Sequence, residues 1–313
     1  MATTLSQKRI LVTGGTGFLG SFVVERLNAL GAEVFSPRSR EFDLCHSENA
    51  RALMEKCRPE AVIHCAVDGG GIGYMRAHPG QIVHRNLLMN THLMHASLEA
   101  GVEVFVGVSS VCAYPRDVPM PLIESRLFEG YPEPSNAGHG LTKRMMMEMG
   151  RAYSQEYGFK ALFPMPVNLY GPRDEFSPER SHVVPALIRR FLEAADLNQE
   201  EVVVWGSGRA TRELLYVEDC ADAIVAMLLK GQGVEPINIG TGVETSIHDL
   251  AHAIADACGY RGRLVFDASK PEGQPRKCLD TSRARELLDW SAKVGLDDGL
   301  KRTVLWYRSQ QSS

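Results

Sequence analysis

A glycine-rich turn near the start of the chain constrains its fold more than any other feature. The apolar run Ile10 to Val12 predicts a buried strand, and apolar spacing from Phe18 to Leu30 predicts a helix. A strand that passes through tight glycines into a helix leaves backbone amides open at the helix N-terminus, where a dinucleotide pyrophosphate can bind. We therefore predict a dinucleotide-binding turn, with a purely structural turn as the alternative. The expected cofactor contacts are Gly14, Thr16, Gly17, Phe18, Leu19 and Gly20.

The remaining chain alternates strand-like and helix-like segments. Further apolar runs predict strands at Val34 to Phe35, Ala61 to Ile63, Val104 to Val108 and Ala161 to Phe163. Helical spacing recurs at Ile82 to Glu99 and Leu141 to Tyr157. Such alternation predicts an α/β fold, a Rossmann-type doubly wound parallel sheet with a smaller mixed α/β C-terminal lobe. The segment from Pro115 to Asn136 is rich in Pro, Glu and Ser and too long for a simple connection, so we expect a loop over a site.

Composition and charge argue against several classes of protein. With 313 residues, 44% hydrophobic and 23% charged, the chain can bury a large core. A formal net charge of −4 offers no basic field for nucleic acid, and no apolar run approaches the roughly 18 residues that cross a bilayer. Lys8 and Arg9 lead into a strand rather than an apolar targeting region, and the seven cysteines lack the paired spacing of zinc ligands. We expect a cytoplasmic protein with reduced thiols and no metal.

The end of the second predicted strand bears on the choice of dinucleotide. An NAD site places an acidic residue there to hold the ribose hydroxyls. This chain instead carries Arg38 and Arg40 within Ser36-Pro37-Arg38-Ser39-Arg40, and two guanidinium groups suit a 2′-phosphate. The pattern favours NADP(H), with a solvated basic turn as the alternative. Asp43, just beyond, either accepts a hydrogen bond from the adenine amino group or caps the helix that follows.

Longer motifs extend over almost the whole chain. They are Gly69-Gly70-Gly71-Ile72-Gly73-Tyr74, Asn86-Leu87-Leu88-Met89-Asn90-Thr91, Ser109-Ser110-Val111-Cys112-Ala113-Tyr114-Pro115, Asn168-Leu169-Tyr170-Gly171-Pro172, Ser181 to Arg190, Trp205-Gly206-Ser207-Gly208 with Arg212-Glu213, and Ser269-Lys270-Pro271-Glu272-Gly273 with Pro275-Arg276-Lys277. Together they resemble the GDP-L-fucose synthases of the extended short-chain dehydrogenase/reductase superfamily. The resemblance implies 3,5-epimerisation of a GDP-4-keto-6-deoxy sugar, followed by reduction at C4 with NADP(H).

Two residues match the family's epimerisation pair. Epimerisation next to a ketone needs one group that takes a proton and another that gives one, and the resemblance assigns Cys112 and His182 to this work. A thiol and an imidazole both exchange protons near neutral pH. Taken alone, a cysteine is more often a small buried apolar residue, and a histidine more often a structural hydrogen-bonding residue.

The reductive step matches the family except at one position. Ser110 matches the serine that holds the C4 oxygen, and Lys143 matches the lysine that binds the nicotinamide ribose. The family's tyrosine is replaced by His139, four residues before Lys143 and thus on the same helix face. An imidazole has a reference pKa of about 6.5, against about 10 for a phenol, and a nearby ammonium favours its neutral form. His139 could be a working acid, a hydrogen-bonding placeholder, an adaptation to another substrate, or an engineered change.

The resemblance also implies where the nucleotide sugar binds. Arg190 and Arg212 match guanidinium groups that face the diphosphate. Asn168 and Trp205 complete this predicted pocket, and Lys270 and Lys277 lie near its rim. The alternative for any one of these cations is a solvated surface charge. Guanine is implied by the family alone, since no residue reads a base unambiguously.

Domain boundaries and assembly follow from the same comparison of patterns. We expect an NADP-binding Rossmann domain at residues 1–167, to which 215–240 return, and a substrate lobe at 168–214 and 241–313. The two long helices correspond to those that pair across a two-fold axis in related enzymes, which predicts a homodimer. The predicted activity is an NADP(H)-dependent epimerase and reductase. Its alternatives are an epimerase without net reduction and a nucleotide-binding protein that has lost catalysis.

Overall fold

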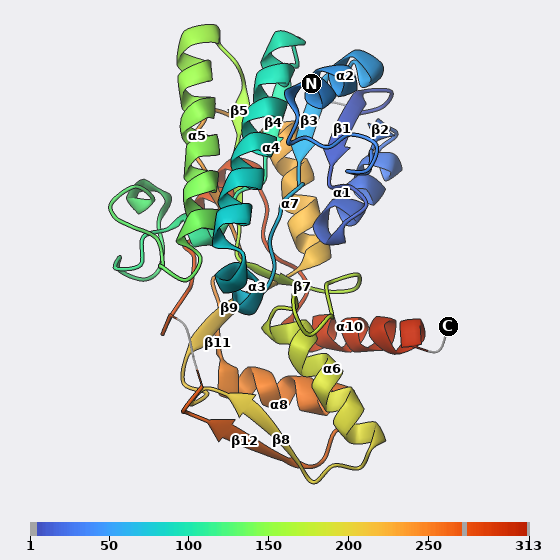
Figure 1. The fold of residues 1–313 in the computed structure, drawn as a ribbon, viewed down its shortest axis with the longest axis vertical. Helices are drawn as coiled ribbons and strands as arrows, with labels where there is room; N and C mark the ends of the chain where they lie inside the picture. The colour runs from blue at the N-terminus through green and yellow to red at the C-terminus, as the bar shows by residue number, and fades with distance from the viewer. Residues whose placement is uncertain (1–4, 271–273, 312–313) are drawn as a thin grey trace.

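The computed structural model describes residues 5–270 and 274–311, so the motif residues Pro271, Glu272 and Gly273 lie outside the described residues. The strands of the main sheet are β1 (Arg9–Thr13), β2 (Glu33–Phe35), β3 (Ala61–His64), β4 (Val104–Gly107) and β5 (Ala161–Leu162). All neighbouring strands are parallel, in the order β2-β1-β3-β4-β5 (Figure 1). Strands β1, β3 and β4 consist mostly of buried apolar residues, as expected where helices cover both faces of a sheet.

The helices of this unit are divided between the two faces of the sheet. They are α1 (Phe18–Ala29), α2 (Ser47–Cys57), α4 (Pro79–Glu99), α5 (Ala137–Tyr157) and α7 (Val217–Lys230). The connection through α1 runs from β1 to β2, in the opposite direction to the connections through α2, α4 and α5. Because crossovers between parallel strands are right-handed, this reversal puts α1 on one face and the other three on the opposite face. Helix α7 packs against α1, and α4 packs against α2 and α5.

A second group of elements extends from the carboxyl ends of the main strands (Figure 1). Its strands are β7 (Asn168–Tyr170), β8 (Glu201–Trp205), β9 (Thr211–Tyr216), β11 (Glu244–Ser246) and β12 (Arg263–Asp267), and its helices are α6 (Val183–Asp196), α8 (Ile247–Cys258) and α10 (Leu296–Gln311). Strand β9 pairs in parallel with β7 and antiparallel with β11, so this smaller lobe is mixed. It has its own apolar core, which includes Phe191, Leu250 and Leu300.

Later segments of the chain return to the main unit. Strand β10 (Ile237–Ile239) pairs in parallel with β6 (Pro164–Pro166), and helix α9 (Ser282–Leu288) contacts both α7 and β10. The remaining short helices are α3 (Ile72–Ala77), η1 (Val111–Ala113) and η2 (Glu124–Arg126). The structure therefore has the predicted α/β architecture, a parallel Rossmann-type sheet with a smaller mixed lobe. Within residues 5–270 and 274–311, no helix has both the length and the apolar character needed to cross a membrane.

Helix α5 begins earlier than its apolar pattern predicts. We expected it to start at Leu141, but it starts at Ala137, so His139 lies within its first turn. The sequence did not predict this first turn because it contains Gly138 and Gly140, and glycine is unfavourable in helices. The structure explains Gly140: a Cβ there would collide with the carbonyl oxygen of Cys112. The glycine therefore lets α5 approach η1 closely.

Candidate active site

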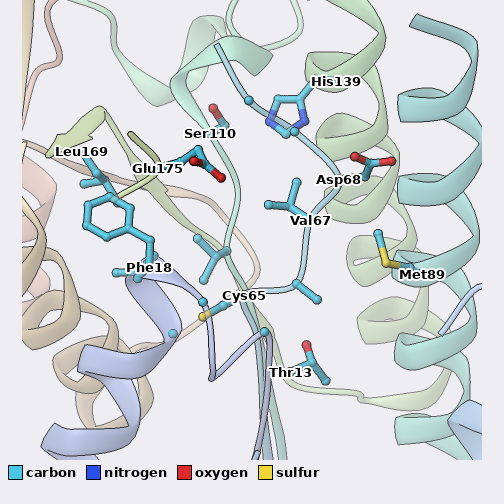
Figure 2. A pocket seen from close by; sticks show the side chains of 18 of the residues that line it. Thr13, Phe18, Cys65, Val67, Asp68, Met89, Ser110, His139, Leu169 and Glu175 are labelled. Atoms are coloured by element: carbon cyan, nitrogen blue, oxygen red, sulfur yellow. The ribbon is translucent and has the colours of Figure 1, made fainter. Parts of the chain in front are cut away.

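One large pocket opens where the main strands end and the smaller lobe begins. Its volume is about 1250 Å³, above the roughly 300–1,000 Å³ of most small-ligand sites. Thr13, Cys65 and Ser110, which lie at or just beyond the ends of main-sheet strands, line it (Figure 2). Asn168 and His182 from the later chain complete this part of the lining. Ligands of open parallel sheets bind where the strand order reverses, here between β1 and β3. The pocket has this position and has room for two ligands.

The glycine-rich turn lines this pocket between β1 and α1. Gly14 has φ +70°, and a Cβ there would lie 2.7 Å from the backbone nitrogen of Ala66. A Cβ on Gly20 would collide with the carbonyl oxygen of Gly14. No side chain caps α1, so amides of its first turn are open to a ligand. Each residue predicted from this turn lines the pocket, and the cradle fits a dinucleotide pyrophosphate.

The two arginines expected at a 2′-phosphate lie at the rim of this pocket. Arg38 and Arg40 are exposed and do not belong to its lining, whereas their neighbours Pro37 and Ser39 do. Both arginines are therefore close in sequence to residues that line the cleft, but neither is part of its lining. The assignment of a phosphate to them remains a prediction.

Asp43 lines the pocket and is held by the chain around it. Its Oδ1 accepts a hydrogen bond from the Cys45 amide at 3.0 Å, and Arg85 Nη2 lies 3.6 Å away. The hydrogen bond from Cys45 and the charge of Arg85 lower its pKa. Helix α2 begins at Ser47 after the N-cap residue His46, so Asp43 does not occupy the cap position. Of our two interpretations of Asp43, the helix cap is wrong.

Cys112 and His182, distant in sequence, line the same pocket. Cys112 lies in η1 directly after β4, and Asn136 Nδ2 donates a hydrogen bond to its Sγ at 3.2 Å. His182 occupies the N-cap position of α6. Its side chain is exposed to the open cleft, yet desolvation by surrounding protein atoms lowers its pKa below the ordinary value. The structure thus brings together a thiol and an imidazole that can both exchange protons.

Ser110 and Lys143 lie beside this pair in the pocket lining. The Ser110 hydroxyl oxygen accepts a hydrogen bond from the Cys112 amide at 3.2 Å, which leaves its own hydrogen free for a ligand. Lys143 is buried and donates to the Val108 carbonyl oxygen at 2.7 Å. Burial lowers the pKa of Lys143 to about 8, and Cys65 opposes this shift. The ammonium is therefore charged at neutral pH and loses its proton in mildly alkaline solution.

His139 lines the pocket from α5 and is buried (Figure 2). Its Nδ1 is buried and has no hydrogen-bond partner among the residues that the structure describes. Burial, then the charge of Lys143, then His182 lower its pKa to about 3. We expected the ammonium to favour the neutral imidazole, and it does, although burial is the larger cause. At neutral pH this ring is an uncharged hydrogen-bonding group rather than an imidazolium acid.

Most of the residues predicted to bind the nucleotide sugar lie outside the pocket lining. Asn168 lines the pocket and donates to the Glu213 carbonyl oxygen at 3.1 Å. Arg190 donates to the carbonyl oxygen of Val203. Arg212 donates through Nη1 to the carbonyl oxygens of Thr211 and Gln274, both at 2.7 Å. The other predicted residues also lie outside the pocket lining, and they are Trp205, which is 60% exposed, Lys270 and Lys277.

Several pocket residues were not predicted. The clearest are charged or titratable side chains from three separate segments, namely Asp68, Tyr74, Arg85, Arg173, Asp174 and Arg180. Burial raises the pKa of the Asp174 carboxyl to about 7. The motif from Gly69 to Tyr74 was a usable signal for two of them, because it marks the loop after β3 as unusual. No residue of the segment 115–136 lines the pocket, but Asn136 at its end donates a hydrogen bond to the pocket residue Cys112, and the loop over a site stays a prediction.

Comparison with known proteins agrees with this geometry. Residues 10–240 match the family described as the NAD dependent epimerase/dehydratase family. GDP-L-fucose synthase 1 of Arabidopsis thaliana is 39% identical over 300 residues, which cover 96% of this chain and 93% of that protein. GDP-L-fucose synthase of Escherichia coli (strain K12) is 36% identical over 317 residues, 98% of each chain. A solved GDP-L-fucose synthetase from Naegleria fowleri, bound to NADP, superposes with a TM-score of 0.91 at 29% identity over 99% of this chain and 97% of that chain.

The fold, the glycine cradle and the acid-base cluster define a class of protein: the chain belongs to the NAD dependent epimerase/dehydratase family. Proteins of this family build on a dinucleotide-binding sheet of the kind described above. Within the family, the chain belongs with the GDP-L-fucose synthases, as its motifs predict, and it is a nucleotide-sugar epimerase/reductase.

Proposed function

We propose that this protein is an NADP(H)-dependent epimerase and reductase of a GDP-4-keto-6-deoxy sugar. The observation that carries the proposal is that Cys112 and His182 share one pocket with Ser110 and Lys143, beside the glycine cradle. The names of the relatives support GDP as the nucleotide, and the NADP held by the Naegleria fowleri structure supports the phosphorylated dinucleotide.

Epimerisation at C3 and C5 uses the acidity of protons beside the C4 ketone. Cys112 and His182 act from the two sides of the ring: one takes a proton from carbon, and the other returns one to the opposite face. The hydrogen bond from Asn136 Nδ2 to Sγ holds the sulfur in place for this exchange. Ser110 donates its hydroxyl hydrogen to the C4 oxygen and stabilises the negative charge that develops there.

Reduction at C4 follows in the same pocket. A nicotinamide held here would supply the hydride. Lys143 and the turn from Gly14 to Gly20 hold the dinucleotide, and Ser110 again holds the C4 oxygen. His139 can donate an N–H hydrogen bond to this oxygen, but as an uncharged ring it carries no easily released proton at neutral pH, so the proton that turns the C4 alkoxide into a hydroxyl comes from water. We therefore propose that epimerisation is intact and that reduction is weakened.

The nucleotide half of the substrate extends toward the smaller lobe in this proposal. Residues 1–167 with 215–240 form the NADP-binding domain, and 168–214 with 241–313 form the substrate lobe, except that α9 (Ser282–Leu288) packs on α7 and β10 of the NADP-binding domain. Asn168 marks the boundary. Arg190 and Arg212 must exchange their present carbonyl partners for phosphate oxygens, and Trp205, Lys270 and Lys277 must close over the nucleotide. We also propose a homodimer, in which α4 and α5 of the two subunits pair across a two-fold axis.

The two half-reactions can be measured separately. The protein would be incubated with GDP-4-keto-6-deoxymannose in deuterium oxide, and deuterium at C3 and C5 followed by NMR while NADPH oxidation is followed by absorbance. We expect deuterium uptake at C3 and C5, and we expect NADPH oxidation to be slower than this uptake. The same reaction without NADPH is the control, since it should retain deuterium uptake alone. Absence of both activities would overturn the proposal.

His139 favours one second candidate, an epimerase without net reduction. In that case the product keeps its C4 ketone after full deuterium uptake, and NADPH is not consumed. A protein that has lost catalysis would bind NADPH and show no deuterium uptake. The same experiment thus separates all three functions.

A further inference from the structure

The triple-glycine loop that follows β3 contacts the chain immediately before His182. The Gly71 amide donates to the Arg180 carbonyl oxygen at 2.7 Å. A Cβ on Gly71 would collide with the carbonyl oxygen of Ser181, and one on Gly70 would lie 3.3 Å from the Arg180 carbonyl oxygen. The loop can therefore receive residues 180 and 181 only because glycine lacks a side chain.

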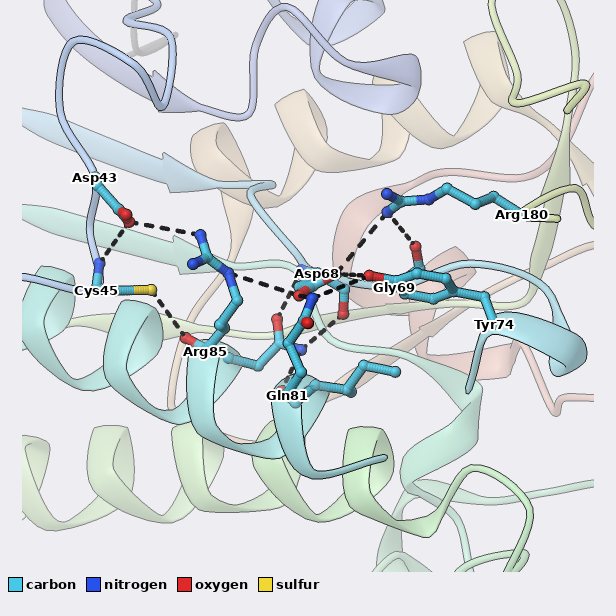
Figure 3. Close-up of polar contacts among 10 residues, drawn as sticks. Asp43, Cys45, Asp68, Gly69, Tyr74, Gln81, Arg85 and Arg180 are labelled. Carbon is cyan, nitrogen blue, oxygen red and sulfur yellow. Dashed lines mark hydrogen bonds and ion pairs between the residues drawn. The ribbon is translucent and has the colours of Figure 1, made fainter. Parts of the chain in front are cut away.

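The side chain of Arg180 makes a second set of contacts between the loop after β3 and the chain before His182 (Figure 3). Its Nη2 donates to the Gly69 carbonyl oxygen at 2.8 Å. Its guanidinium carbon lies 4.3 Å from the centroid of the Tyr74 ring, within the range of a cation–π contact. The Tyr74 hydroxyl donates to Asp68 Oδ1 at 2.8 Å, which orients the ring beneath the guanidinium.

Asp68 ties this contact to helix α4 of the main unit. The Asp68 amide donates to Asn86 Oδ1 at 3.0 Å, and Asn86 Nδ2 donates to the Asp68 carbonyl oxygen at 2.8 Å. Its carboxylate also accepts from Gln81 Nε2 at 2.9 Å. Asn86 is fully buried, so the loop has a rigid support.

We infer that Arg180 and the loop Gly69–Gly71 are positioning residues for His182, because they clamp the two preceding residues to the end of β3 and so hold the imidazole in the pocket with Cys112. We call this set of contacts the clamp. The inference rests on the proposed function, in which His182 exchanges protons with the sugar. His182 makes no side-chain capping bond to α6, so the helix that it begins does not orient its ring. The clamp also gives a role to the motif from Gly69 to Tyr74, which takes no part in the proposed epimerisation or reduction.

Two alanine substitutions within this motif form a matched pair. Gly71→Ala places a methyl group against Ser181, whereas Gly73→Ala meets nothing within 4 Å. We expect Gly71→Ala to lower the rate constant of deuterium uptake about tenfold or more, with the KM and the NADPH Kd changed less than about twofold. Gly73→Ala should behave like the unaltered protein. Arg180→Gln should act like Gly71→Ala, and Arg180→Lys should recover part of the rate, because an ammonium can still donate to the Gly69 carbonyl oxygen.

A second readout follows the ring of His182 itself. In protein with labelled histidine, the NMR signal of His182 should move in Gly71→Ala and Arg180→Gln but not in Gly73→Ala. This signal tests the clamp even if the unaltered protein shows no deuterium uptake, a result that would overturn the proposed function instead. An unmoved signal, or an unchanged rate of uptake in both variants, would overturn the inference. Tyr74→Phe, which removes the hydroxyl that donates to Asp68 and accepts from Gln81, serves the same comparison if Gly71→Ala does not fold.

Discussion

Lys143 lies one helical turn beyond His139 on α5, and its positive charge helps to hold the pKa of the His139 imidazole at about 3. Burial is the larger cause, and it also lowers the pKa of Lys143 to about 8. At neutral pH the pair therefore carries a single positive charge, on the lysine. A phenol in the place of His139 would leave this charge unchanged but would bring a more acidic hydrogen than an imidazole N–H. The histidine thus alters the supply of protons rather than the local charge.

The first prediction concerns His139→Tyr. The phenol should restore a general acid beside Lys143, which typically contributes on the order of 10²- to 10⁴-fold in rate. We expect faster NADPH oxidation with GDP-4-keto-6-deoxymannose, measured by absorbance, and unchanged deuterium uptake at C3 and C5. His139→Phe, which has a ring but no acid, is the control and should remain slow. A slower His139→Tyr enzyme would instead identify the imidazole as an adapted acid.

The second prediction concerns stability in acid. The pKa values of His64 and His139 are both lowered to about 3, so the unfolded chain binds protons below pH 6.5 that the folded chain does not. The free energy of unfolding should therefore fall as the pH drops from about 6.5 toward 3, by roughly 1.4 kcal/mol per pH unit for each histidine. His139→Tyr should lose one histidine's share of this slope in urea titrations at several pH values. Equal slopes in the two proteins would contradict the buried, neutral His139.

The third prediction concerns alkaline pH. Lys143 has its pKa lowered to about 8, so its ammonium loses its proton as the pH rises through that value. The kcat/KM for NADPH oxidation should fall over the same range, because this quantity reports groups of the free enzyme. Lys143→Arg keeps its charge to far higher pH and should lack the alkaline fall, even if its maximal rate is lower. A persistent fall near pH 8 in this variant would assign the titration to another group.

The fourth prediction separates proton exchange from cofactor binding. Cys112→Ser keeps an acceptor for the hydrogen bond from Asn136, and His182→Asn keeps a polar side chain at the start of α6. Each should lower deuterium uptake by at least about 10²-fold, because it removes one member of an acid-base pair. NADPH binding, measured by fluorescence, should remain as in the unaltered protein. Full exchange in either variant would remove that residue from the mechanism.

The fifth prediction concerns the glycine cradle. Gly20→Ala forces a methyl group against the Gly14 carbonyl oxygen, so the turn must open. Overpacking of this kind costs about 1–3 kcal/mol, and we expect both weaker NADPH binding and a lower free energy of unfolding. Gly80→Ala is the matched control, since a Cβ there meets nothing within 4 Å. Tight NADPH binding by Gly20→Ala would show that the pyrophosphate lies elsewhere.

The parts of the site that could be predicted are those with local causes. The turn from Gly14 to Gly20 follows a strand and opens a helix, and Gly20 is required by the carbonyl oxygen of Gly14 within the same turn, whereas Gly14 is required by the distant backbone of Ala66. The pairing of His139 with Lys143 follows from the four-residue spacing on one helix. The start of α5 was missed because Gly140 serves a contact with η1 and Gly138 a contact with Val83 of α4, and local propensity does not record such contacts.

The sequence by itself determined the alternation of strands and helices and the glycine-rich turn between β1 and α1, because periodicity acts between near neighbours. The acid-base residues are predictions from the family resemblance. Only the tertiary structure decided the protonation state of His139, since desolvation depends on every atom packed around the ring. It also turned Arg190 and Arg212 toward backbone carbonyls and joined Gly69 to Arg180 across 111 residues. Contacts at that separation arise from the packing of whole lobes, and no local pattern encodes them.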